Sequence, residues 1–116
     1  MSRRRVVVTG LGAISPVGNN VADTWRNIVA GTSGVVSISR FDASAFKSRI
    51  AGEVKGFDVS EYLSPKEARR MDVFIHYGMP AGTQAFRDAG LSNPDAARAT
   101  YAVIVHLLGS AALDVA

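Results

Sequence analysis

Cysteine is absent from the 116 residues, and this absence excludes several kinds of site. A disulfide framework, a cysteine metal site and a thiol nucleophile all need a residue that the chain does not contain. Long apolar runs are missing too, since none approaches the roughly 20 residues that span a bilayer. The start, RRR before three valines, has too short an apolar run for a signal peptide and lacks a small-x-small cleavage site. We therefore expect a soluble, cytoplasmic protein that does not interact with membranes.

The sequence also has little net charge and no cluster of residues typical of a catalytic site. The formal net charge is only +3, and the basic residues are dispersed except in residues 3–5 and 66–70. No basic stripe interleaved with aromatics is present, so nucleic-acid binding is not expected. The two histidines, His76 and His106, have no second metal ligand or nucleophile at a useful spacing, and no GxSxG motif occurs. The sequence alone therefore predicts no catalytic residue, no metal site and no cofactor.

What is present begins with the stretch RRRVVVTGLGAISPVG at residues 3–18. Three consecutive valines predict a strand covered on both faces, and Gly10 and Gly12 predict a turn after it. The dinucleotide template GxGxxG would need glycine where Ser15 stands, and Pro16 prevents a helix from starting there. A Rossmann-like nucleotide site at these glycines is therefore only a weak alternative to a structural turn.

The middle of the chain predicts one amphipathic helix and a long irregular excursion. Asn19 or Asn20 can cap a helix that ends at Gly31 and carries Trp25, expected as a core anchor, on its apolar face. Residues 35–63 look mostly irregular, with a short strand at 50–54. Long excursions of this kind are often functional or interfacial.

The second half predicts two further buried elements. Residues 73–90 are apolar or small nearly all round, which indicates a helix packed closely against another backbone, with Pro80 kinking or dividing it. Residues 101–105 read as a second buried strand. Alternating strands and helices place the chain in the α/β class, as one domain or part of one.

Three cations make the most suggestive site. Ser64, Pro65 and Glu67 are typical of a helix start, and Lys66, Arg69 and Arg70 then follow at spacings that share one helical face. Such a run is commonly a solvated surface. The functional interpretation is docking of an acidic partner.

The order of several motifs resembles the β-ketoacyl-acyl-carrier-protein synthases, most closely the FabF-like type. The matching stretches are VVVTGLG, SPVG, Trp25, AGTSG, AGEV and SPKEARRMD, across residues 3–90. The resemblance implies the amino-terminal part of a thiolase-like, layered αβαβα fold that forms a homodimer when complete. It also implies condensation of acyl groups with malonyl-carrier protein, and docking of acyl carrier protein on Lys66, Arg69 and Arg70.

The family's cysteine and two active-site histidines lie beyond the matched region, so neither His76 nor His106 corresponds to them. Near Thr100 the family's glycine-rich turn is replaced by TYAVIVHLLGSAALDVA, with only Gly109 to echo it. We expect residues 1–116 to be a partial amino-terminal domain with a divergent tail at 100–116. A frameshift or premature stop would give such a tail, and a deliberately short product is the alternative. The leading prediction is an inactive fragment of a 3-oxoacyl-acyl-carrier-protein synthase. The alternative is a non-catalytic carrier-protein-binding module.

An incomplete layered fold should leave apolar surface and strand edges uncovered, and we therefore predict a marginally stable monomer that tends to associate. Sedimentation at several concentrations together with urea unfolding tests this. A clearly monomeric species that unfolds cooperatively would contradict the prediction.

Overall fold

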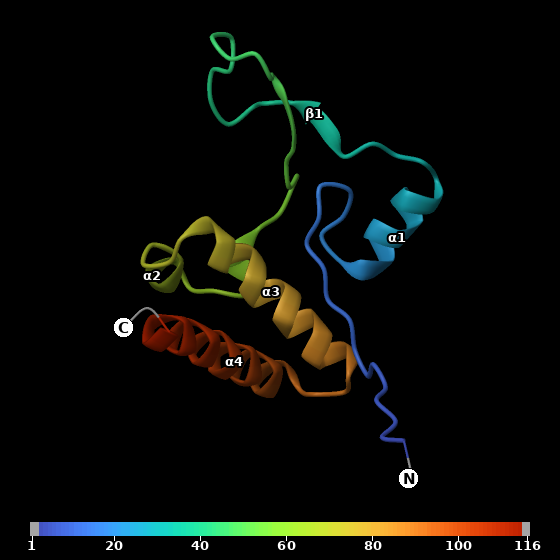
Figure 1. Ribbon diagram of the computed structural model, residues 1–116, viewed down its shortest axis with the longest axis vertical. Coiled ribbons are helices and arrows are strands. Elements are labelled where there is room, and N and C mark those ends of the chain that lie inside the picture. Colours follow the sequence, from blue (N-terminus) through green and yellow to red (C-terminus); the bar gives the residue numbers. More distant parts are fainter. Residues whose placement is uncertain (1–2, 115–116) are drawn as a thin grey trace.

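The computed structural model describes the backbone of residues 3–114 and the side chains of residues 3–108. The elements, in chain order, are α1 (Val21–Val29), β1 (Val35–Ser37), β2 (Ile50–Gly52), the 3-10 turn η1 (Val59–Glu61), α2 (Pro65–Ala68), α3 (Val73–Asp88) and α4 (Asn93–Asp114). Figure 1 shows α3 in the middle of the molecule, α4 beside it, and the β1–β2 hairpin projecting away from both helices.

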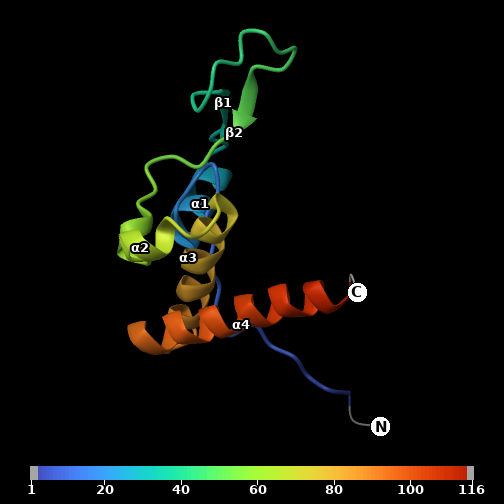
Figure 2. The same cartoon turned by 90° about the vertical axis from the view of Figure 1, so that its left-hand side faces the viewer.

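The largest packed region joins α3 to α4, which cross each other in Figure 2. Ala96 and Thr100 of α4 are buried against Met79 and Thr83 of α3. The Thr83 hydroxyl donates to the Met79 carbonyl over 2.8 Å, so this polar group is satisfied inside its own helix. Small residues at the crossing allow the two helices to approach closely.

Residues 10–13 lie against the other side of α3, in a contact that only glycine permits. A Cβ added to Gly12 would stand 1.8 Å from the Ala81 carbonyl oxygen, and one added to Gly10 would stand 2.1 Å from that of Ala85. Two side chains of α3 accept hydrogen bonds from the same segment: Asp88 from the Leu11 amide at 3.0 Å and Gln84 from the Ala13 amide at 3.2 Å. This confirms the prediction that the small-residue helix packs closely against another backbone.

The remaining elements are short and locally determined. The Asn20 side chain caps α1 by accepting from the Asp23 amide at 2.8 Å, and Gly31, with φ of 72°, ends the helix as predicted. Strands β1 and β2 pair antiparallel with Val35 opposite Gly52. The Lys55 ammonium ties the hairpin base to the amino-terminal turn by donating to the Pro16 carbonyl at 2.8 Å.

Both predicted buried strands are wrong. Residues 6–8 form no strand, and Val6 is 93% exposed. Residues 101–105 belong to α4, whose first turn holds Pro94 and is capped by Ser92. A strand needs a hydrogen-bonded neighbour, whereas a helix satisfies its own backbone. In the part of the chain described, the β1–β2 pair is the one sheet, and the fold is an incomplete α/β fold.

The expectation for Trp25 also fails, and that for Pro80 fails in part. Trp25 is 66% exposed and is not a core anchor, because most of the apolar face of α1 faces solvent. Pro80 does not divide α3, which continues as one helix through that position, and a kink there stays a prediction. Proline removes one backbone donor, and the packed residues on either side of Pro80 hold the helix together.

The molecule is open rather than compact. Its radius of gyration is 17.2 Å, whereas a compact chain of this length has about 13 Å. Its accessible surface is 8816 Å², against about 6,100 Å² for a compact monomer of this mass. Much apolar side-chain surface therefore faces solvent, as the sequence led us to expect for an incomplete layer.

Serine side chains hold carboxylates at the starts of α2 and α4. The Ser64 hydroxyl and amide donate to Glu67, and these bonds hold the pKa of the Glu67 carboxyl below its ordinary value. The Ser92 hydroxyl, assisted by Arg98, does the same to the pKa of Asp95. Because both pKa values are depressed in the folded chain, this stabilisation is present above the ordinary carboxyl pKa and is lost as the pH falls through the folded value.

We expect Ser64→Ala to raise the pKa of Glu67 toward its ordinary value, since both the largest cause of the shift and the hydroxyl cap disappear. A carbon-detected NMR titration of the Glu67 carboxyl measures the change. Ser64→Thr, which keeps a hydroxyl, should retain the low pKa. An identical titration curve in the alanine variant would contradict this account of the cap.

We expect Gly12→Ala to lower the free energy of unfolding by about 1–3 kcal/mol, because its new methyl group meets the backbone of α3. Gly78→Ala is the matched control. Its Cβ would meet only the Ile104 side chain at 3.9 Å, so it should raise the stability of α3 by about 0.5–1 kcal/mol. Urea titration followed by circular dichroism compares the two, and equal effects would rule out the close contact.

Candidate functional site

The three predicted cations lie in α2 and in the turn that joins it to α3. Lys66 lies within α2, Arg69 is its C-cap residue, and Arg70 belongs to the turn that follows. All three side chains are exposed. The sequence predicted that the three cations share one helical face. In the structure α2 ends at Ala68, so only Lys66 lies in the helix itself. The three together are here called the cationic turn (Lys66, Arg69 and Arg70).

A capping box fixes the start of this turn. The Ser64 hydroxyl accepts from the Glu67 amide at 3.3 Å, and the Glu67 carboxylate accepts from the Ser64 amide at 2.9 Å. Pro65 at the first helical position adds a backbone already restricted to helical φ. The Glu67 carboxylate is therefore held at the amino-terminal end of α2, where the helix dipole favours it.

His76 fixes the other end of the turn. Its Nε2 lies 2.8 Å from the Ala68 carbonyl oxygen. A carbonyl oxygen only accepts, so Nε2 carries the proton and donates it, which joins the last residue of α2 to α3. The prediction that His76 has a hydrogen-bond partner is confirmed, and its side chain is half-buried. The sequence did not reveal that His76 holds the end of α2, because His76 and Ala68 are brought together only by the turn between the two helices.

The charges of the cationic turn are not neutralised within the described residues. The ion pairs found there join Arg26 to Asp23 and Arg98 to Asp95. Arg69 does donate through Nε to the Pro65 carbonyl at 3.3 Å, but that acceptor is uncharged. An exposed positive turn with a fixed backbone can recognise an anionic partner, and it offers no group for acid–base or nucleophilic chemistry.

Other kinds of site find little support. Gly10 and Gly12 face the backbone of α3 at contact distance, so a nucleotide phosphate would have to displace that helix. His106 lies on α4 and not on the cationic turn. Among the described residues, no three histidine, aspartate or glutamate side chains cluster closely enough to bind a metal ion. The described part of the chain also contains no helix with the length and hydrophobicity that a membrane crossing requires.

Comparison with known proteins gives a consistent result. The family model "Beta-ketoacyl synthase, N-terminal domain" matches residues 3–112. The 3-oxoacyl-[acyl-carrier-protein] synthase 2 of Vibrio cholerae is 53% identical over 105 residues, which are 89% of this chain and 25% of the relative. The enzyme of the same name from Coxiella burnetii is 50% identical over 91 residues, which are 78% of this chain and 22% of the relative.

A solved structure supports the same relationship. The ishigamide ketosynthase/chain length factor superposes with a TM-score of 0.71 at 36% sequence identity, covering 81% of this chain and 23% of that one. The chain spans about a quarter of the length of the curated relatives it matches. With the family model matching nearly the whole sequence, the chain belongs to the β-ketoacyl synthase family, in the region of its N-terminal domain.

Proposed function

We propose that this chain is the amino-terminal part of a 3-oxoacyl-acyl-carrier-protein synthase and that its cationic turn docks the acidic carrier protein. The names of the matched relatives support the first half of the proposal. The exposed, unneutralised charges of Lys66, Arg69 and Arg70 support the second half, and they are the observation on which it depends.

The local structure favours docking over a merely solvated surface. Glu67 is the carboxylate nearest in sequence to the three cations, and Ser64 holds it by hydrogen bonds. The backbone of the turn is fixed by the capping box at one end and by His76 at the other. A partner therefore meets positive charge on an ordered backbone, which lowers the entropy lost on binding.

The parent reaction would be decarboxylative condensation of an acyl group with malonyl-carrier protein in fatty-acid biosynthesis. This chain has no cysteine to carry the acyl group, so by itself it should bind carrier protein without catalysing that reaction. The same docking would serve the second candidate, a non-catalytic carrier-protein-binding module. We further propose that the complete parent is a homodimer, as the family resemblance implies. From the composition of the chain we propose that the parent is cytoplasmic and binds neither nucleic acid nor membrane.

Charge reversal tests the docking. Fluorescence anisotropy of a labelled acidic carrier protein should show binding to the full chain that weakens as salt is raised from 50 to 200 mM, because exposed charges are screened. The triple variant K66E/R69E/R70E should lose about tenfold or more in affinity and most of the salt dependence.

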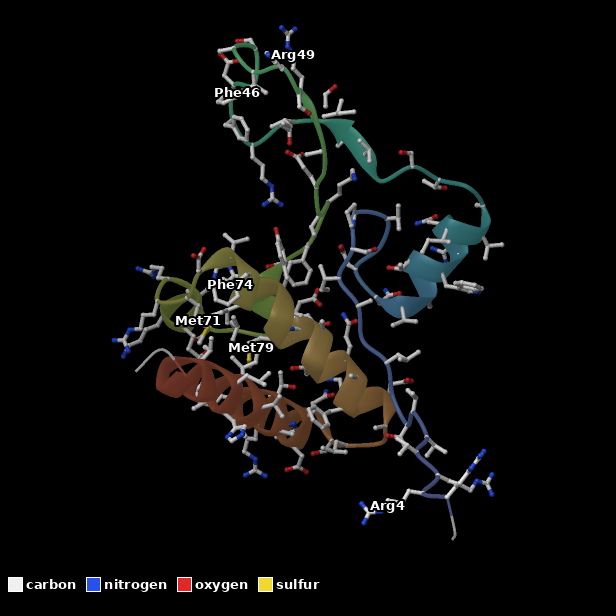
Figure 3. All side chains as sticks on the ribbon, in the orientation of Figure 1. Arg4, Phe46, Arg49, Met71, Phe74 and Met79 are labelled. Carbon is white, nitrogen blue, oxygen red and sulfur yellow. The ribbon has the colours of Figure 1, made fainter. Side chains whose placement is uncertain are left out.

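The matched control is R3E/R4E/R5E, which changes the net charge by the same amount. Figure 3 shows Arg4 at the amino-terminal end of the chain, well away from α2. This control should keep nearly the affinity of the unmodified chain. Equal losses in the two triple variants would reduce the effect to general charge attraction and would overturn the docking proposal, as would the absence of binding by the unmodified chain.

A further inference from the structure

An apolar hollow of about 340 Å³ opens beside the cationic turn. It lies where the ends of η1 and α2 meet α3 and α4. Its lining residues are Tyr62, Leu63, Glu67, Met71, Met79, Ala97, Arg98, Tyr101 and Ala102. Figure 3 shows Met71 and Met79 on the side of α3 that is turned toward α4. We call this space the methionine hollow.

Apolar side chains dominate the methionine hollow. Leu63 and Met79 are each only 5% exposed, and Met71 is half-buried. Methionine is unbranched and polarisable, so two of them give walls that adapt to the shape of an inserted group. The two charged residues of the lining already have partners, since Ser64 holds Glu67 and Asp95 holds Arg98.

The hollow and the cationic turn are adjacent in the chain. Glu67 and Met71 line the hollow. Glu67 directly follows Lys66, and Met71 directly follows Arg69 and Arg70. A partner whose acidic side chains reach the turn therefore has an apolar cavity next to its point of contact. Interfaces of this kind derive most of their affinity from one buried apolar anchor, with the surrounding charges setting orientation and rate.

Size and charge select the occupant. The volume lies near the lower limit of small-molecule pockets, which span about 300–1,000 Å³, and is suited to one large side chain. A second copy of this chain is a poor candidate, because each copy carries a formal net charge of +3 and the turn beside the hollow is itself positive. An acidic partner has the complementary charge.

We propose that the methionine hollow receives an aliphatic side chain from the acidic partner that docks on the cationic turn. The inference rests on the proposed docking function and extends it. The cations attract and orient the acidic segment. Desolvation of the aliphatic side chain between Met71, Met79 and Tyr101 then slows its release.

The chain's own methionines supply the probe. It contains only Met1, Met71 and Met79, so a sample labelled with ¹³C at the methionine methyl groups has three signals, assignable by single Met→Leu variants. Adding the acidic carrier protein should shift or broaden the signals of Met71 and Met79. The signal of Met1 should stay unchanged.

A blocking variant supplies the affinity test. Ala102→Trp places a large ring on the lining of the hollow without altering charge, and it should weaken binding about tenfold with the salt dependence unchanged. Val103→Trp is the matched control, because Val103 is also exposed on α4 but does not line the hollow. It should bind like the unmodified chain.

The outcomes separate the two proposals. Salt-dependent binding that leaves the Met71 and Met79 signals unperturbed, or an Ala102→Trp variant that binds as well as Val103→Trp, would overturn the hollow and leave the docking intact. Failure of the unmodified chain to bind carrier protein would overturn both.

Discussion

The close contact between residues 10–13 and α3 organises this structure. Gly10 and Gly12 approach the carbonyl oxygens of Ala85 and Ala81 within distances that exclude any Cβ. The contact therefore depends on two residue types at once, glycine on one segment and alanine on the other. It fixes the amino-terminal segment along one side of α3 and leaves the opposite side of that helix for α4. The 3-10 turn η1 contacts α3 directly, whereas the hairpin and α1 are joined by hydrogen bonds to the amino-terminal turn.

The cationic turn keeps its positive charge because the nearby carboxylates already bind other groups. Ser64 holds the Glu67 carboxylate, and Asp95 and Asp23 pair with Arg98 and Arg26. The remaining charges of Lys66, Arg69 and Arg70 are thus left facing solvent. Electrostatic attraction from such a turn acts over roughly the Debye length, about 8 Å at physiological salt. An apolar hollow directly beside it is the complementary element, because burial of apolar surface acts only at contact.

The openness of the molecule follows from the same arrangement. A segment of three valines is extended and exposed, and a helix stands where a strand was expected. An apolar segment without a strand neighbour can satisfy its backbone only as a helix or through water. Residues 101–105 satisfy their backbone as part of helix α4, which Ser92 caps. Residues 6–8 form no strand and are exposed to water. The apolar faces left over, including that of α1, are the surfaces that a complete layered fold would cover.

The sequence by itself determined the local features. Asn20 and Ser64 set helix starts through side-chain capping, and Gly31 ends α1 through its positive φ. The small residues of α3 predicted its close packing against another backbone. It also picked out Lys66, Arg69 and Arg70 as a cluster. Tertiary structure alone decided whether residues 6–8 and 101–105 are strands, whether Trp25 is buried, and where the methionine hollow forms. Capping acts within one turn of chain and can be read from spacing, whereas strand pairing and burial depend on which distant segments are there to make contact.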